Sequence, residues 1–342
     1  MLAVVLAAGR GTRLGGLTEQ RSKGMMPVAG KPMIERVLEM LAAASVDRFA
    51  IVVHPEDSEL LEFLDGPNWS HRTGVAYQEE RLGMAHALAQ AAPLVRQAGA
   101  GAFVLASCDN LYPAGHVADL ILLRESRGLD GALTLKWASR REATTSAVVR
   151  LSDDRVTELV EKPRLDDVPS YDDRPGVLTA PSLYVLASDV LPLLSRVSPS
   201  PRGEFEFPSA LGLWIAEGAR LGGRIVERRW TLTRPADLLA LNLHFLRTDP
   251  ACCTVDAPVP DTAAVEPLVR VEPGASIGPG ATLGPQVFLE AGSRLGPRAV
   301  VRRSVVLRGA SVGPGETVEN SVVGPQGVYP CPQKRKEAPG KP

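Results

Sequence analysis

A six-residue spacing of aliphatic side chains near the carboxyl end of the chain restricts the folds that this region can adopt. The series is separated by small residues, is often followed by Gly-Pro, and consists of Val271, Ile277, Leu283, Leu289, Leu295, Val301 and Leu307. After Leu307 the phase slips by one residue, and Val312 and Val318 resume it. One aliphatic residue in every six predicts a parallel β-helix of roughly three coils, in which each repeat forms one short side.

The region before these repeats follows a different pattern. Across residues 1–247, buried strand patterns such as those at 2–7, 49–53 and 103–107 alternate with helix patterns. This alternation predicts an α/β domain with a mostly parallel, helix-covered sheet whose ligands bind beyond the carboxyl ends of the strands. We assign residues 248–266 to a linker, 267–328 to the β-helix and 329–342 to a basic, proline-rich, disordered tail.

Composition excludes several classes of protein. The 342 residues carry 38 basic and 39 acidic side chains, so the chain lacks the charge excess of a general nucleic-acid binder. No apolar stretch approaches the ~18 residues of a membrane span, and residues 2–8 are too short for a secretory leader. The four cysteines match no metal-binding spacing. We therefore expect a soluble, cytoplasmic protein of two domains.

A glycine-rich loop follows the first predicted strand. It reads Leu6-Ala-Ala-Gly-Arg-Gly-Thr-Arg13, and Lys23 and the segment Pro27-Val-Ala-Gly-Lys-Pro32 come after it. Glycines let backbone N–H groups turn toward an anion, and nearby cations suit a polyphosphate. The spacing does not match a dinucleotide fingerprint, because Leu14 stands where a third glycine is needed, and no Gly-Lys-Ser/Thr completes a Walker A loop. An NAD-dependent oxidoreductase is thereby disfavoured.

The complete string resembles the first motif of the sugar-1-phosphate nucleotidyltransferases. This resemblance implies a Rossmann-like nucleotidyltransferase domain and an enzyme of the EC 2.7.7 class in nucleotide-sugar biosynthesis. It implies that Arg13 contacts the β- and γ-phosphates and that Lys23 lies near the α-phosphate, both as catalytic residues. The nucleotide-binding residues that it implies in this segment are Leu6, Ala8, Gly9, Gly11 and Thr12.

Three later segments resemble further motifs of the same family. The run from Gln78 to Gly83 resembles the motif that reads the base, and it is especially similar to that of N-acetylglucosamine-1-phosphate uridyltransferases, which favours UTP or dTTP. Asp109 stands where the family binds Mg²⁺. Glu161 and Lys162 resemble the Glu-Lys-Pro motif that contacts the sugar hydroxyls and the sugar phosphate. Because Pro163 follows, we expect the strand to end or bulge at this pair.

The chain departs from the family pattern on the metal and sugar side. Thr231 takes the place of a second metal-binding aspartate, and a hydroxyl is a weaker Mg²⁺ ligand than a carboxylate. Thr179 stands where an asparagine often holds sugar hydroxyls, and we keep it as a sugar-phosphate-site residue. The leading hypothesis is Mg²⁺-dependent nucleotidyl transfer to a sugar 1-phosphate. The alternatives are a regulatory protein that binds nucleotide or sugar phosphate without turnover, and transfer to another acceptor such as a phosphonate or choline phosphate.

The repeat region resembles the left-handed hexapeptide-repeat domains attached to several sugar nucleotidyltransferases. Acyltransferases with such repeats use a histidine as general base, but the five histidines here all precede residue 245. A second, acetyltransferase activity is therefore disfavoured. Because the open ends of a short β-helix expose apolar edges, we expect it to pack on the first domain or to form a homo-oligomer. We expect no nucleic-acid or membrane partner.

Overall fold

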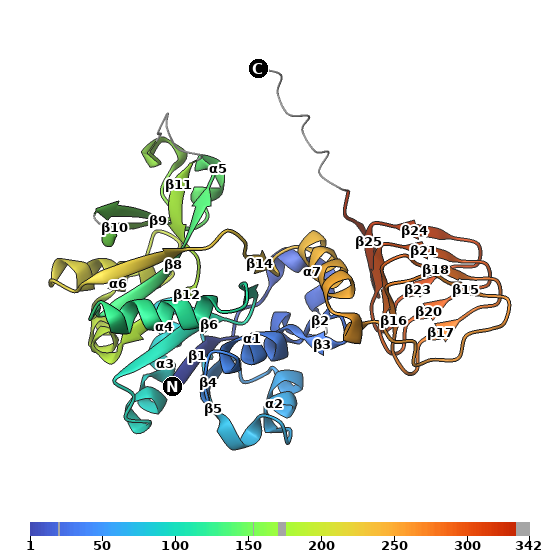
Figure 1. Cartoon of the computed structure of the whole chain (residues 1–342), viewed down its shortest axis with the longest axis horizontal. Coiled ribbons are helices and arrows are strands. Elements are labelled where there is room, and N and C mark those ends of the chain that lie inside the picture. The colour runs from blue at the N-terminus through green and yellow to red at the C-terminus, as the bar shows by residue number, and fades with distance from the viewer. Residues whose placement is uncertain (20, 153, 170–175, 333–342) are drawn as a thin grey trace. The chain divides into compact units, whose positions relative to one another are not determined.

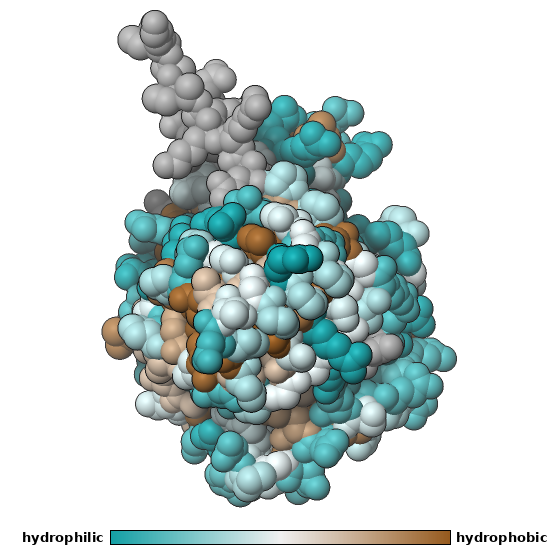
Figure 2. Space-filling model, turned by 90° about the vertical axis from the view of Figure 1, so that its right-hand side faces the viewer, coloured by the Kyte–Doolittle hydropathy of each residue, from teal (hydrophilic) through white to brown (hydrophobic). Residues whose placement is uncertain are grey.

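The computed structural model describes residues 1–19, 21–152, 154–169 and 176–332. The chain forms two compact units. The first unit contains residues 1–9 and 34–230, and the second contains residues 10–33 and 231–332 of the described chain. The glycine-rich segment after residue 9 thus belongs to the same unit as the carboxyl-terminal repeats. The face of the molecule in Figure 2 carries mostly hydrophilic side chains, with apolar ones in small groups.

A ten-stranded sheet forms the centre of the first unit, in the order β11-β9-β10-β13-β8-β12-β6-β1-β4-β5 (Figure 1). The bounds are β1 Leu2–Leu6, β4 Arg48–Val53, β5 Thr73–Tyr77, β6 Ala102–Ser107, β8 Gly131–Ala138, β9 Ala147–Ser152, β10 Arg155–Glu161, β11 Val177–Ala180, β12 Leu183–Ala187 and β13 Leu221–Ile225. Strands β6, β1, β4 and β5 are mutually parallel, as the alternating pattern predicts. The remaining strands form a mixed region, in which β13 and β8 pair in parallel and the other described pairings are antiparallel.

Helices pack on this sheet because their apolar residues recur at helical spacing. In α3 (Met84–Gln97), the buried residues Ala85, Leu88, Ala91 and Val95 line one face, and this helix packs against β1, β4 and β5. The other helices are α1 Met33–Ala42, α2 Ser58–Asp65, α4 His116–Ser126, α5 Arg140–Ala143 and α6 Phe207–Ala216. No helix among the described residues is both long enough and apolar enough to cross a bilayer.

The register of the parallel strands brings three loops to one edge. Leu6 aligns with Val52 of β4 and with Ser107 of β6. Beyond these positions, the Cys108 amide donates to the Leu6 carbonyl (3.1 Å), and the Gln78 amide donates to the carbonyl of the last residue of β4 (2.9 Å). The chain therefore leaves β1, β5 and β6 at the same carboxyl edge of the sheet.

The second unit contains helix α7 (Pro235–Thr248) and three small parallel sheets. Residues 18 apart pair in the first coils, for example Val269 with Val287 and Thr282 with Val300. The strands are β15 Ala264–Val265, β16 Val269–Val271, β17 Ser276–Ile277, β18 Thr282–Leu283, β19 Val287–Leu289, β20 Arg294–Leu295, β21 Val300–Arg302, β22 Ser304–Val306, β23 Ser311–Val312, β24 Thr317–Glu319 and β25 Ser321–Gly324. These sheets fit the predicted left-handed β-helix, whose coils are stacked in Figure 1.

The predicted position of the phase slip is wrong by one repeat. The β-helix core contains Val301, Val306 and Val312, whereas Leu307 is buried outside that core. The coil shortens to 17 residues at β22, where Val287 pairs with Ser304. Arg303, just before β22, adopts a left-handed φ of 45°. The missing residue therefore lies in this corner, where the backbone turns more tightly.

A hairpin follows the last coil. Strand β26 (Gly327–Pro330) pairs antiparallel with β25, and the Cys331 amide donates to the Asn320 carbonyl (2.8 Å). Residues 333–342 of the predicted disordered tail lie outside the described residues. Within the same unit, the segment 10–33 forms 3-10 turns at Thr12–Thr18 and Lys23–Met25 and the short strands β2 (Pro27–Val28) and β3 (Lys31–Pro32).

Candidate functional site

The loop after β1 presents backbone at the carboxyl edge of the sheet. Leu6 ends the strand, Ala8 is buried, and Gly9 has open space where a Cβ would stand. The Ala8 carbonyl accepts a hydrogen bond from Nε of Arg81 at 2.7 Å. This contact ties the glycine loop to the loop that follows β5, so two segments predicted to bind nucleotide are adjacent.

The loop from Gln78 to Gly83 is held rigidly. Gln78 is buried, and its Nε2 donates to the Gly83 carbonyl (3.1 Å) and lies 3.0 Å from Nδ1 of His86. The other ring nitrogen of His86 lies 3.2 Å from Gln90 Nε2. Gly83 has a φ of 104°, and a Cβ there would lie 2.7 Å from the Phe205 carbonyl oxygen. The amide of Gln78 is therefore oriented by its own loop and by α3.

Asp109 follows β6 at the same edge and is half-buried. Its Oδ1 accepts a hydrogen bond from Nδ2 of Asn110 at 2.8 Å, and Asn110 Oδ1 is buried without a hydrogen-bond partner among the described residues. No cluster of three or more histidine, cysteine or acidic side chains suited to a metal occurs among the described residues. These oxygens fit Mg²⁺ held by one or two protein groups and completed by substrate phosphates and water.

Charged side chains surround Lys162. Strand β10 ends at Glu161, and Lys162 adopts a left-handed φ of 40°, which confirms that the strand ends at this pair. The Lys162 Nζ lies 3.3 Å from a Glu161 oxygen, 3.6 Å from Glu206 and 3.8 Å from Glu204. Glu206 also pairs with Arg202. The ammonium group is therefore held among three carboxylates.

The half-buried Glu161 and the buried Glu206 differ in acidity. Burial raises the pKa of Glu161, and the nearby Lys162 ammonium offsets this effect only in part. Burial acts in the same direction on Glu206, but the hydrogen bond from Arg202 and the charge of Lys162 outweigh it and lower the pKa. Glu161 is thus the carboxylate that more readily takes up a proton.

Thr179 is not adjacent to this charged group. It lies buried in β11, and its hydroxyl donates to the Lys136 carbonyl at 3.0 Å. Strand β9 lies between β11 and β10, and Thr179 aligns with Val148 of β9, whereas Glu161 aligns with Ala147. The threonine hydroxyl is used within the sheet.

The remaining predicted residues belong to the second unit. Gly11 has a φ of 69° and precedes the 3-10 turn that contains Thr12 and Arg13, both exposed. A Cβ on Gly11 would lie 3.3 Å from the Cβ of Lys23, so the loop and the lysine are in close contact. Thr231 Oγ1 lies 3.1 Å from Thr233 Oγ1.

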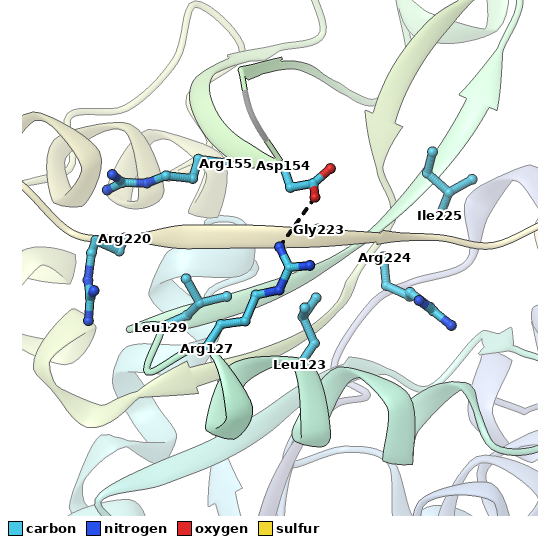
Figure 3. A pocket seen from close by; sticks show the side chains of 9 residues that line it. All are labelled: Leu123, Arg127, Leu129, Asp154, Arg155, Arg220, Gly223, Arg224 and Ile225. Atoms are coloured by element: carbon cyan, nitrogen blue, oxygen red, sulfur yellow. Dashed lines mark hydrogen bonds and ion pairs between the residues drawn. The ribbon is translucent and has the colours of Figure 1, made fainter.

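A separate hollow of about 570 Å³ lies in the first unit (Figure 3). Its lining includes four arginines, Arg127, Arg155, Arg220 and Arg224, and none of the predicted site residues. In Figure 3, Arg127 points toward Asp154, and the other three guanidinium groups point in different directions. Arg127 pairs with Asp154 at 3.3 Å and Arg224 with Asp119 at 3.6 Å. The hollow is therefore not an organised anion site.

Sequence reasoning gave no role to Arg81 and only a weak indication for Arg202 and Glu206. Arg81 lies inside the predicted base-reading segment, but no pattern indicates that it binds the Ala8 carbonyl. Arg202 and Glu206 stand in a run, Arg-Gly-Glu-Phe-Glu, that resembles a loop near the substrate only weakly. Glu206 contacts Lys162 and also pairs with Arg202, so it joins segments about 40 residues apart, which no local pattern encodes.

Comparison with known proteins identifies the family. The family model described as nucleotidyl transferase matches residues 2–231. Bifunctional protein GlmU of Methanococcus maripaludis strain S2 is 30% identical over 248 residues, which cover 72% of this chain and 54% of that protein. The match thus spans about half the length of that relative. UTP--glucose-1-phosphate uridylyltransferase AglF of Haloferax volcanii is 30% identical over 69% of this chain and 93% of its own length.

Two further similarities extend this picture. Glucose-1-phosphate thymidylyltransferase of Streptomyces griseus is 29% identical over 95% of this chain and 81% of its own length. A solved structure of a UDP-glucose pyrophosphorylase complexed with UDP-glucose matches with a TM-score of 0.63 and 19% identity, over 72% of this chain and 98% of that chain. The latter supports the fold alone.

Proposed function

This chain belongs to the nucleotidyl transferase family, and from that membership we propose that it transfers a nucleotidyl group from a nucleoside triphosphate to a sugar 1-phosphate. In this reaction a phosphate oxygen of the sugar attacks the α-phosphorus in line. The bond from the α-phosphorus to the bridging oxygen of the β-phosphate breaks, and pyrophosphate leaves with the electron pair. The protein's task is to neutralise charge and to align two polyanions.

The observation that carries the proposal is the shared carboxyl edge of β1, β5 and β6. There the open backbone at Gly9, the rigid loop from Gln78 to Gly83 and the half-buried Asp109 all follow parallel strands. Ligands of α/β sheets bind at such edges. The named activities of the relatives favour UTP or dTTP as the nucleotide. We assign base recognition to Gln78 Oε1, which would accept the N3–H of uracil or thymine.

We assign the triphosphate to the Gly11 loop. Backbone N–H groups and the Thr12 hydroxyl bind phosphate oxygens, and Arg13 forks onto two oxygens of the β- and γ-phosphates. Lys23 neutralises charge that develops at the α-phosphate, and losing one such donor typically costs on the order of 10²–10³ in rate. Glu161 accepts hydrogen bonds from sugar hydroxyls, and Lys162 binds the sugar phosphate.

Asp109 and Asn110 are the residues that would hold Mg²⁺. When bound, the ion neutralises phosphate oxygens and favours the departure of pyrophosphate. Four described cysteines are free thiols, which supports a reducing compartment such as the cytoplasm.

The test is pyrophosphate release with a panel of triphosphates and sugar 1-phosphates, with and without Mg²⁺. We expect turnover that needs Mg²⁺ and falls by on the order of 10²–10³ in Asp109→Ala and Lys23→Ala. Asp65→Ala and Arg48→Ala remove exposed charges of the same sign away from the carboxyl edge and should leave turnover unchanged. Equal effects of site and control variants would contradict the role assignments.

A second candidate is a regulatory protein that binds nucleotide without turnover. The pairing of the Thr231 hydroxyl with Thr233 favours it, because that hydroxyl is engaged within its own segment and is a weak metal ligand. Tight nucleotide binding by calorimetry, with no product from any acceptor, would support this candidate over the enzyme.

A further inference from the structure

The β-helix contacts the segment between the two cations assigned to the triphosphate. Nη1 of Arg21 lies 2.7 Å from Oε1 of Glu290, and the two side chains are only 9% and 10% exposed. The other carboxylate oxygen of Glu290 accepts the amide of Arg308 at 2.7 Å, one coil further along. Glu290 directly follows β19, so a rung of the β-helix fixes this carboxylate toward Arg21.

The terminal hairpin touches the same segment. Gln326 Nε2 donates to Glu19. A Cβ on Gly16 would lie 2.7 Å from Oη of Tyr329, and a Cβ on Gly324 would lie 2.6 Å from Cδ2 of Leu17. Side chains of the hairpin and of the 3-10 turn that contains Arg13 thus lie directly against the backbone of the other segment.

Helix α7 and the first coil hold the other end of the segment. Asn242 is fully buried, accepts the Ala29 amide at 2.7 Å and donates to the Pro27 carbonyl at 3.1 Å. The side chain of Arg270 lies against Gly30 and leaves no room for a Cβ there. Contacts from residues 242–329 therefore fix the segment on both sides of Lys23.

The segment 10–33 has little regular structure of its own. It consists of 3-10 turns, one of them interrupted at Gly15, and a two-residue hairpin of β2 and β3. Few internal backbone hydrogen bonds define such a segment, so its conformation depends on what packs against it.

We propose that the β-helix acts as a clamp on the triphosphate loop, with Glu290 as the positioning residue that acts through Arg21. We define the loop clamp as Glu290 of the β-helix, Gln326 and Tyr329 of its terminal hairpin, and Asn242 of helix α7. This proposal rests on the proposed function, because it takes the loop to be the triphosphate site. The clamp keeps the loop in the conformation that binds nucleotide. When the clamp is lost, only a fraction of molecules has this conformation, and the apparent Kd equals the intrinsic Kd divided by that fraction. Saturating nucleotide would restore the loop and hence the rate.

Glu290→Gln is the sharpest variant. The amide oxygen still accepts from the Arg308 amide, whereas the charge that holds Arg21 is lost. We expect KM for the nucleotide to rise by about tenfold while kcat stays within about twofold, which corresponds to a competent fraction near one tenth. Arg21→Gln should raise KM by a similar factor, again with kcat nearly unchanged. The double variant should have little further effect, because both changes remove the same Arg21–Glu290 interaction.

The second readout is hydrogen exchange of the amides in residues 10–33, measured without substrate on the full chain. Exchange there should accelerate by about tenfold in Glu290→Gln, with the β-helix amides unchanged. Glu319→Gln, an exposed change on β24 of the same β-helix, should move neither readout. If Glu290→Gln does not fold, Arg21→Lys replaces it as the test variant. This change keeps the positive charge but removes the planar guanidinium, so KM should rise by a smaller factor while kcat stays nearly unchanged.

The outcomes separate the two proposals. Wild-type protein that turns over no substrate contradicts the proposed function, yet the exchange comparison still tests the clamp. Unchanged exchange at residues 10–33 in both Glu290→Gln and Arg21→Gln overturns the clamp, whatever the activity. A fall in kcat with unchanged KM would also overturn it, since a positioning role predicts the reverse.

Discussion

At the scale of single residues, Gly83 controls how the base-reading loop packs. Its φ of 104° is accessible to glycine, and its Cα faces the Phe205 backbone so closely that a Cβ would lie 2.7 Å from the oxygen and 2.9 Å from the nitrogen. Phe205 in turn donates its amide to the Leu82 carbonyl and accepts the amide of Ala85. Gly83 therefore couples the loop to the segment that carries Glu204 and Glu206.

We predict that Gly83→Ala lowers the free energy of unfolding by about 2–4 kcal/mol, the sum of backbone strain and overpacking. Urea denaturation measures this change. Gly99→Ala is the control for a positive φ without a contact, because its φ is 61° and no atom lies within 4 Å of the new Cβ. The control should cost only the strain, about 1–2 kcal/mol. Equal losses would mean that the contact with Phe205 is unimportant.

The raised pKa of Glu161 predicts a pH dependence of stability. Burial makes the folded protein hold this proton above the usual glutamate pKa of 4.5. The stabilisation from the protonated form is complete below 4.5 and is lost as pH rises through the raised pKa. Glu161→Gln should flatten this decline in unfolding free energies measured at a series of mildly acidic pH values. Glu56→Gln, an exposed change, should retain the wild-type slope.

At the scale of elements, α7 shows how a helix in the chain's last third orders a loop near its beginning. Its apolar residues pack inward, and Asn242 among them is the polar exception. The side chain also donates to the Leu238 carbonyl within the helix (2.9 Å), so its three hydrogen bonds fix its orientation. An amide that both donates and accepts is suited to satisfying a neighbouring backbone N–H and C=O together.

We predict that Asn242→Leu lowers the free energy of unfolding by about 2–4 kcal/mol, because the Ala29 amide and the Pro27 carbonyl lose their buried partner. Denaturant titration followed by circular dichroism provides the measurement. Gln90→Leu on α3 removes an amide whose partners are on its own helix, and it should cost less than about 1 kcal/mol. A loss no greater than that of Gln90→Leu would refute the bridging role of Asn242.

At the scale of the whole molecule, the two ends of the β-helix differ. The last coil continues into the β25–β26 hairpin, whereas β15 is the edge strand at the other end. Near that edge Val255, Val259, Val265 and Leu268 are more than a third exposed. Exposed apolar groups beside an open strand edge favour association with another chain.

The homo-oligomer expected from the sequence therefore stays a prediction, and we expect it to form through the exposed apolar residues near β15. Light scattering after size exclusion should give more than one chain at micromolar protein concentration. Val265→Lys should shift the mass toward the monomer, whereas Val160→Lys, which places the same charge at an exposed position of β10, should not. A monomeric mass for the wild-type protein would contradict the predicted homo-oligomer.

Features that repeat over short distances could be predicted from the amino-acid order alone. The hexad spacing specified a β-helix, because each rung needs one inward aliphatic residue. The buried run of β1 and the glycines after it specified a loop at a strand end, and Pro163 indicated the end of β10. These signals are local, so they survive without knowledge of the partner segments.

Which distant segments meet becomes visible in the folded chain and not before. The six-residue count predicted the phase slip after Leu307, but in the structure the slip lies at the corner near Arg303. There Val306, and not Leu307, packs in the β-helix core. The antiparallel pairings of β12 with β6 and of β10 with β13, the contact of Glu206 with Lys162 and the Arg21–Glu290 pair likewise join positions far apart in the chain. Such contacts depend on how the completed sheets and coils pack, and neither periodicity nor motif spacing carries that information.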